Sequence, residues 1–188
     1  MRILVLSDTH SAILKAKEVY RKLNSKEKID YIIHCGDYYE DAIKLGSELN
    51  AKVIATKGNC DNSFSDDEYN ILETEIGNII VVHGHMQHVS YSLEYLYDLA
   101  IDNNAIMITF GHTHRNIFTN LNGIYIMNPG SLSRPRDGST GTFGLIEIKN
   151  ETLSGSIYTY DNFMNDKIDK KKVTTGHLSS MINYSDRF

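Results

Sequence analysis

Residues 3–10, ILVLSDTH, place a short apolar run directly before a polar cluster. The same order occurs in later segments: YIIHC before GDYYED, KVIAT before KGNCDN, IIVV before HGHMQH and AIMITF before GHTHR. Short apolar runs that are rich in β-branched residues and bounded by Gly and Asp are typical of centrally buried strands. The sequence therefore predicts strands at 3–6, 31–35, 52–56, 79–82 and 105–110.

Helical periodicity separates several of these strands. Apolar side chains recur at helical spacing in residues 11–24, 38–49 and 90–102, and Ser11 is a candidate N-terminal cap of the first helix. The expected apolar faces comprise Ile13, Ala16, Tyr20 and Leu23; Tyr39, Ala42, Ile43 and Leu49; and Leu93, Leu96, Tyr97 and Ala100. Residues 68–82 predict a hairpin that turns near Gly77 and Asn78. After residue 115, the runs NIFTN, GIYIMN, TFGLIEIKN and LSGSIYTY predict antiparallel strands. The expected fold class is α/β, with two packed sheets flanked by helices.

The composition limits the class of protein. A chain of 188 residues that is 41% hydrophobic and 23% charged is typical of one globular domain, and not of a disordered or coiled-coil protein. Its net charge of -5 argues against bulk capture of nucleic acid or anionic membrane. The apolar run at 3–6 is too short for a signal peptide or a membrane span, and two cysteines are too few for a disulfide framework. We therefore expect a cytoplasmic protein with reduced thiols and no membrane association.

The last residues differ from the rest of the chain. From Asp161 onward the sequence loses its periodicity and carries the charge run Lys170–Lys172. We expect a domain at 1–160 and a solvated polar tail at 161–188, with a tail that docks onto a partner or a second subunit as the alternative.

The polar clusters carry residue types that bind metals. Asp8, Asp37, Asn59, His83 and His112 follow one another at intervals of 29, 22, 24 and 29 residues, close to the length of a βαβ unit. The carboxyl ends of strands in an open α/β sheet line one crevice, so we expect these clusters to meet. His10 and His114 each lie two residues from another cluster member, which in extended chain directs both side chains of a pair to one side.

Seven such ligands exceed the needs of one tetrahedral ion, and a carboxylate is able to bridge two ions. The mixture of carboxylate, amide and imidazole suits Mn, Fe, Zn or Ni. Two ions about 3.5–4 Å apart form a clamp for in-line displacement at phosphorus and generate a hydroxide nucleophile at neutral pH. Taken singly, Asp8 could cap a helix and His83 could be a core histidine, but their joint placement favours a binuclear site.

Six motifs carry a family resemblance: DTH at 8–10, GD at 36–37, GNCD at 58–61, HGH at 83–85, GHTH at 111–114 and NPGSLSRPR at 128–136. Together they resemble the calcineurin-like metallophosphoesterases, and most of all the small bacterial and archaeal phosphodiesterase branch. The resemblance spans residues 1 to about 160 and implies a four-layer αββα sandwich, with two mixed β-sheets flanked by helices. It implies that Asp8, His10 and His114 bind a first divalent ion, that Asn59, His83 and His112 bind a second, and that Asp37 bridges both.

The same resemblance implies the chemistry. A metal-bridging hydroxide would attack phosphorus, with Asp37, Asn59 and His83 at the catalytic centre and two ions as cofactors: Mn first, with Ni, Fe or Zn as alternatives. The segment after residue 128 is expected to border the site, where Ser131, Arg134 and Arg136 would bind substrate. The alternative for this segment is a proline-containing turn with exposed arginines.

One residue departs from the family pattern. Many members carry GNH, whose His is the presumed general acid, whereas this chain has Cys60 at that place. Cys60 is either a proton donor or, as we expect, a small residue packed behind Asn59. Asp61, His85 and His34 are weaker candidates for orienting a ligand or donating a proton, and structural hydrogen bonding is the alternative for each. Without a strong acid, esters with good leaving groups should react best, so we expect a preference for aryl phosphodiesters.

Two functions of different classes remain open. The first is a phosphodiesterase that acts on a small organic or nucleotide-type phosphodiester, with a phosphomonoesterase or nuclease as competitor. The acidic charge and the lack of a basic stripe argue against long nucleic acid. The second is a non-catalytic scaffold for protein partners, because a retromer subunit shares this fold. A homodimer is expected from the resemblance alone.

Overall fold

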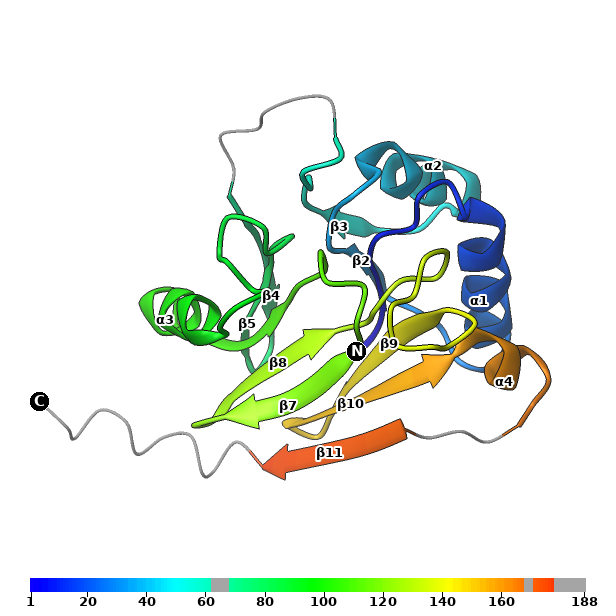
Figure 1. Cartoon of the computed structure of the whole chain (residues 1–188). Coiled ribbons are helices and arrows are strands. Elements are labelled where there is room, and N and C mark those ends of the chain that lie inside the picture. Colours follow the sequence, from blue (N-terminus) through cyan, green and yellow to red (C-terminus); the bar gives the residue numbers. More distant parts are fainter. Residues whose placement is uncertain (62–67, 168–170, 178–188) are drawn as a thin grey trace, which may run out of the picture.

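The computed structural model describes residues 1–61, 68–167 and 171–177. Two stacked β-sheets form the centre of the molecule, with helices on the outside (Figure 1). One sheet has the strand order β11-β10-β9-β1-β2-β3 and the other β4-β5-β6-β8-β7. The strands are β1 (Arg2–Leu6), β2 (Tyr31–His34), β3 (Val53–Ala55), β4 (Asn70–Thr74), β5 (Gly77–Val81), β6 (Ala105–Thr109), β7 (Ile117–Leu121), β8 (Ile124–Asn128), β9 (Thr142–Lys149), β10 (Thr152–Thr159) and β11 (Lys171–His177).

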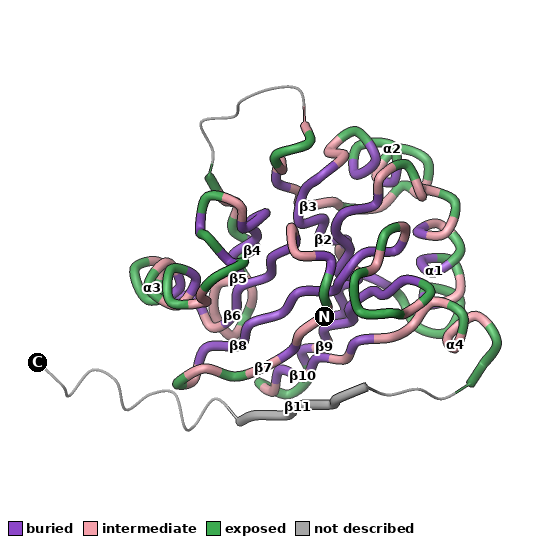
Figure 2. Tube along the Cα trace, viewed as in Figure 1, coloured by how far each residue is buried: buried purple, intermediate pink, exposed green. Residues whose placement is uncertain are grey.

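Alternating side chains on the central strands fill three apolar clusters. Ile3 and Val5 on β1 point between the two sheets, where they meet residues of the second sheet such as Val81. Leu4 and Leu6 point the other way and pack under α1 (Ile13–Lys26) and α2 (Tyr39–Leu49). Helix α3 (Glu94–Asp102) covers the far face of the second sheet. The central strands are accordingly buried along their length (Figure 2). This arrangement confirms the predicted αββα sandwich of two mixed sheets, because strands alternate their side chains between two faces.

Two local predictions were wrong. Ser11 does not cap the first helix: α1 begins at Ile13, and the amide of Ser11 donates to a carboxylate oxygen of Asp41 at 2.8 Å. The side chain of Ile43 is 50% exposed, and α2 instead buries Ala42 and Leu45. The strands after residue 115 pair antiparallel with one another as predicted, β7 with β8 and β9 with β10, and β8 also pairs parallel with the earlier strand β6. Contacts between segments, which periodicity does not report, decided the positions of Ser11 and Ile43.

The end of the chain also differs from expectation. Residues 160–164 form the short helix α4 (Tyr160–Met164), and β11 pairs antiparallel with β10 at the edge of the first sheet. Residues 171–177 were expected in a solvated tail, but a free strand edge recruits backbone groups whatever the side-chain pattern. The remainder of the expected tail, 168–170 and 178–188, lies outside the described residues.

The carboxyl ends of the parallel strands lie at one edge of the sandwich. β1, β2 and β3 run parallel in one sheet, and β5, β6 and β8 run parallel in the other. The segments that follow these strands contain the predicted polar clusters. Among the helices in the described part of the chain, none is long and apolar enough to cross a membrane.

Candidate metal centre

The loops that follow the parallel strands hold unusual backbone conformations. Asp8, His10, Asp37, His112 and His114 all have positive φ, between 41° and 66°. Such conformations cost of order 1–3 kcal/mol for residues other than glycine and persist where the surroundings impose them. Strain at five candidate ligands, each just beyond the end of a strand, points to a functional site at this edge.

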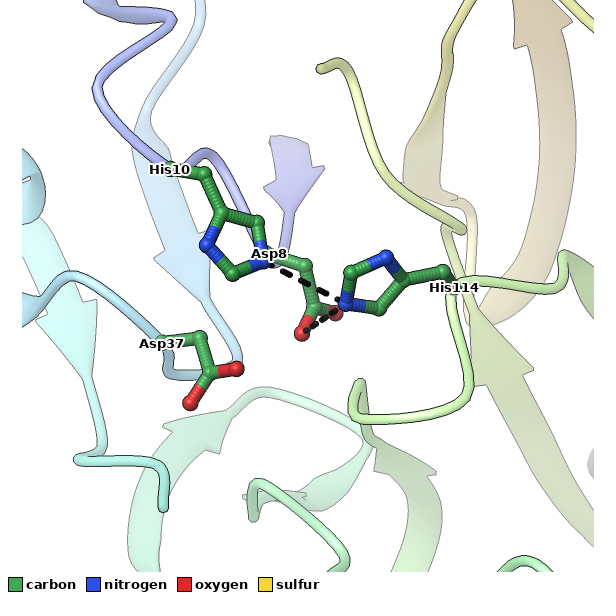
Figure 3. Close-up of side chains that lie close together, drawn as sticks. All are labelled: Asp8, His10, Asp37 and His114. Carbon is green, nitrogen blue, oxygen red and sulfur yellow. Dashed lines mark hydrogen bonds and ion pairs between the residues drawn. The ribbon is translucent and has the colours of Figure 1, made fainter. Parts of the chain in front are cut away.

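One group of ligand atoms consists of Asp8, His10, Asp37 and His114, whose oxygen and nitrogen atoms lie within 4.8 Å of one another (Figure 3). The Nε2 atoms of His10 and His114 are 3.3 Å apart, and Nε2 of His114 lies 3.2 Å from Oδ1 of Asp8. Oδ1 of Asp8 is fully buried and accepts no hydrogen bond within the described residues. Burying a carboxylate oxygen without a partner is costly, and a cation held by these four side chains would satisfy it.

A second group consists of Asn59, His83 and His112. Oδ1 of Asn59 lies 3.1 Å from Nε2 of His83 and 2.9 Å from Nδ1 of His112. Nε2 of His83 is also 3.3 Å from Oδ1 of Asp37, which belongs to the first group. The seven residues that the sequence singled out therefore lie together, with Asp37 in contact with both groups.

Hydrogen bonds to carbonyl groups orient two of the rings. Nδ1 of His83 donates to the carbonyl of Cys35 at 2.8 Å, and Nδ1 of His114 donates to the carbonyl of Arg134 at 2.7 Å. A neutral ring that carries its proton on Nδ1 has a lone pair on Nε2. This lone pair of His83 faces oxygens of Asp37 and Asn59, and that of His114 faces an oxygen of Asp8. Lone pairs that face one another need a cation between them, and an outer carbonyl partner is typical of metal-binding histidines. The residues present therefore fit divalent metal ions.

The protonation states of Asp8, His10 and His112 agree with this interpretation. Burial raises the pKa of Asp8, but the adjacent His114 and His83 rings outweigh it and hold the pKa below its ordinary value. Burial, together with Arg134 and His114, lowers the pKa of His10, and burial also lowers the pKa of His112. The contact with Asp8 raises the pKa of His114, so a metal ion at Nε2 of this ring would have to displace a proton. At neutral pH an ionised Asp8 thus faces the neutral rings of His10 and His112, the forms that bind metal.

Glycines let the loops approach one another. A Cβ added to Gly58 would overlap Oδ1 of Asp37, and a Cβ added to Gly111 would overlap the hydroxyl of Ser7. That hydroxyl donates to Oδ2 of Asp8 at 2.6 Å. Both glycines are therefore required for close approach at the site.

Cys60 does not pack behind Asn59 as expected. Its side chain is exposed and borders a pocket of about 450 Å³ that also reaches Asp37, Asn59 and Arg134. Partial burial and the nearby Asp37 raise the pKa of the Cys60 thiol to about 11. The packed interpretation was wrong because residue size alone does not say on which side of a loop a side chain lies.

Two of the weaker candidates have structural roles. The carboxylate of Asp61 accepts the amides of Tyr39 at 2.7 Å and Gly58 at 2.8 Å, which braces two loops. His34 is fully buried, and its Nε2 lies 3.0 Å from the hydroxyl of Thr9. That hydroxyl in turn donates to Asp41 at 2.7 Å. The chain of contacts from His34 to Asp41 ties the Asp8–His10 loop to α2, and sequence reasoning missed it because its members lie far apart in the sequence.

His85 occupies a different position. Its ring centre lies 5.3 Å from that of His83 and 6.3 Å from that of His112, so it flanks the second group. Nδ1 of His85 is buried and has no hydrogen-bond partner among the described residues.

The residues that follow β8 have two different positions relative to the site. Ser131 is fully buried, and its hydroxyl donates to the carbonyl of Asp8 at 2.7 Å. The prediction that Ser131 binds substrate was therefore wrong, because its oxygen is engaged inside the loop. Arg134 and Arg136 line the pocket beside the ligands, as predicted. Sequence reasoning did not single out Arg115 as a candidate site residue, although Arg115 directly follows the GHTH motif that holds two candidate ligands.

Comparison with known proteins agrees with this geometry. The model of the calcineurin-like phosphoesterase superfamily domain matches residues 1–151. The chain belongs to this superfamily. It is 28% identical over 158 residues to a probable metallophosphoesterase of Bacillus subtilis, YsnB, covering 84% of this chain and 90% of YsnB. It is 31% identical over 146 residues to the phosphodiesterase MJ0936 of Methanocaldococcus jannaschii, covering 69% of this chain and 83% of that protein. These bacterial and archaeal relatives confirm the small prokaryotic branch.

Solved structures of this superfamily fold superpose on the chain. A predicted phosphoesterase from Streptococcus pneumoniae matches with a TM-score of 0.75 and 25% identity, covering 93% of this phosphoesterase and 96% of the other. Vps29 of Entamoeba histolytica, solved in complex with Zn²⁺, matches with a TM-score of 0.71 and 22% identity, covering 94% and 97%. The second likeness shows a shared fold only.

Proposed function

We propose that this phosphoesterase is a phosphodiesterase that hydrolyses a small organic or nucleotide-type phosphodiester with two divalent ions, Mn first among them. The observation that carries the proposal is that Asp37 contacts both groups of ligand atoms: it lies within 4.8 Å of the other ligand atoms of the first group, and its Oδ1 is 3.3 Å from Nε2 of His83 in the second. Membership of the superfamily and the phosphodiesterase relative support the same activity.

Each group of residues has a distinct role in this reaction. Asp8, His10 and His114 would hold one ion, Asn59, His83 and His112 the other, and Asp37 both. Bound ions supply an activated water nucleophile and neutralise charge on the phosphate oxygens. Arg134 and Arg136 line the same pocket and would orient the phosphate oxygens with their guanidinium groups.

The leaving group receives little help from the chain. Cys60 borders the pocket at a position where many members of the superfamily carry a histidine. A thiol is a weaker acid than an imidazolium. Leaving groups that need no proton should therefore react best, which again favours aryl phosphodiesters. A cytoplasmic location, a homodimer and the exclusion of long nucleic acid stay predictions.

A metal-reconstitution experiment tests the proposal. Metal-stripped protein is resupplied with Mn, Ni, Zn or Mg, and its bound metal and its hydrolysis of bis-p-nitrophenyl phosphate and p-nitrophenyl phosphate are measured. We expect diester cleavage that a transition metal restores, that Asp37→Ala abolishes and that Asp98→Ala, a matched change on the exposed face of α3, leaves intact. Protein that binds two ions per chain but cleaves neither ester would refute the proposal and favour the scaffold function.

A further inference from the structure

A second pocket, of about 480 Å³, lies beside the metal centre. Arg136 lines both this pocket and the pocket at the candidate metal ligands. Thr113 also lines the second pocket, and in the sequence it lies between the candidate ligands His112 and His114. The pocket therefore adjoins the place where the phosphodiester would sit. Its volume falls in the range of small-molecule sites, roughly 300–1,000 Å³.

The pocket combines an apolar lining with polar groups. Val89, Leu93, Phe110 and Ile117 contribute apolar surface, and Val89 and Phe110 are buried. The hydroxyl of Ser90 and the amide oxygen of Asn116 are able to form hydrogen bonds there, whereas the hydroxyl of Thr113 already accepts from the side chain of Asn128 at 3.0 Å. Such a lining suits a flat ring with polar edges, such as a nucleobase.

Two exposed arginines, Arg115 and Arg136, line this pocket. The side chain of neither makes an ion pair or a hydrogen bond within the part of the chain that the structure describes. The carboxylate of Asp137 is engaged by Asn116 and by the amide of Ser139 instead. In a chain of net charge -5, free arginines beside a pocket mark a local site for anions.

A simple phosphodiester carries one negative charge, which Arg134 and Arg136 at the first pocket would face. Arg115 lines the second pocket only, so it would have no anion to bind if the substrate carried a single phosphate. Resting on the proposed function, we propose that this pocket binds a nucleotide substituent of the phosphodiester, with its base against the apolar lining and a second phosphate on Arg115.

Two esters with the same leaving group test the base-binding part. These are the p-nitrophenyl ester of thymidine 5′-monophosphate and methyl p-nitrophenyl phosphate, whose methyl group cannot fill the pocket. We expect a kcat/KM for the thymidine ester about tenfold higher or more, and we expect Ser90→Trp, which fills the pocket from an exposed position, to remove most of that ratio. Equal kcat/KM values for the two esters in the wild type would overturn the assignment.

Calorimetric binding of thymidine 3′,5′-bisphosphate and thymidine 5′-monophosphate to the metal-loaded protein tests the second phosphate without turnover. We expect the bisphosphate to bind more tightly, and Arg115→Gln to weaken its binding about tenfold. Arg21→Gln, the same change at an exposed position on α1, should bind both compounds as the wild type does. Binding of the bisphosphate that is unaffected by Arg115→Gln would refute the role of Arg115. Failure of the proposed function would differ, since neither ester would then be cleaved while the binding comparison would still decide the pocket.

Discussion

Replacing Ser131 by Ala should destabilise the protein by removing one oxygen that joins two loops. The hydroxyl of Ser131 donates to the carbonyl of Asp8 at 2.7 Å, and it accepts the amides of Ser133 at 3.2 Å and Arg134 at 2.9 Å. Ser131 is fully buried, so water does not reach its place in the variant. Ser131→Ala therefore leaves three backbone groups without this partner.

The size of the effect follows from these contacts. The buried Asp8 carbonyl loses its shorter hydrogen bond but keeps a contact of 3.3 Å with the hydroxyl of Ser133, and the two amides belong to residues that are partly or largely exposed. Taking about 1 kcal/mol for each lost hydrogen bond gives a loss of about 3 kcal/mol in the free energy of unfolding. At about 3 °C per kcal/mol for a chain of this size, the midpoint of thermal unfolding, Tm, should fall by about 9 °C.

Thermal unfolding of the metal-free protein, followed by circular dichroism, measures this fall. Ser133→Ala is the matched control, because it removes only the 3.3 Å contact at a partly exposed position and should lower Tm by about 2 °C or less. A Ser131→Ala variant that unfolds at the wild-type temperature but has a raised KM for phosphodiesters would refute this reasoning and restore the substrate-binding role.

Three further predictions concern the centre and its support. Gly58→Ala should abolish metal binding and activity because the added Cβ overlaps Asp37. In the control Gly138→Ala the added Cβ meets open space, so the free energy of unfolding should fall by only about 1 kcal/mol because of the positive φ. Metal content and unfolding curves would distinguish the two variants. Burial lowers the pKa of His34 to about 4, so the folded protein keeps this ring neutral while the unfolded chain takes up a proton below about pH 6.5. The free energy of unfolding should therefore fall by about 3 kcal/mol between pH 7 and pH 4, and urea unfolding of His34→Gln with the same pH dependence as the wild type would contradict this. Mn²⁺ at a hundredfold excess over its Kd should raise the free energy of unfolding by about 2.7 kcal/mol for each ion bound, or about 5.4 kcal/mol for two, and a rise in Tm that persists in Asp37→Ala would argue against the shared ligand.

The strands and candidate ligands were predictable because their signals are local. Residues 3–10 show both an apolar run and the polar residues that follow it, and the same holds after β2, β3, β5 and β6. Parallel strands carry their polar ends to one edge, so the convergence of Asp8, Asp37 and His83 could be inferred before any contact was known.

Other features depended on which surfaces meet. Whether Ser131 faces the pocket or the inside of its loop is decided by the Asp8 carbonyl, which lies 123 residues away in the sequence. The exposure of Cys60 likewise follows from the packing of its loop against Asp37, whose carboxylate accepts the Cys60 amide at 2.9 Å.

The sequence by itself thus determined the sandwich, the edge at which its strands end and the seven candidate ligands, because strand periodicity and ligand chemistry are properties of short segments. Only the tertiary structure decided which neighbouring side chains brace that centre and that Arg115 lines a second pocket with Arg136. The physical reason is that hydrogen bonds and pockets form between distant segments, and their partners are set by the stacking of two sheets rather than by any local pattern.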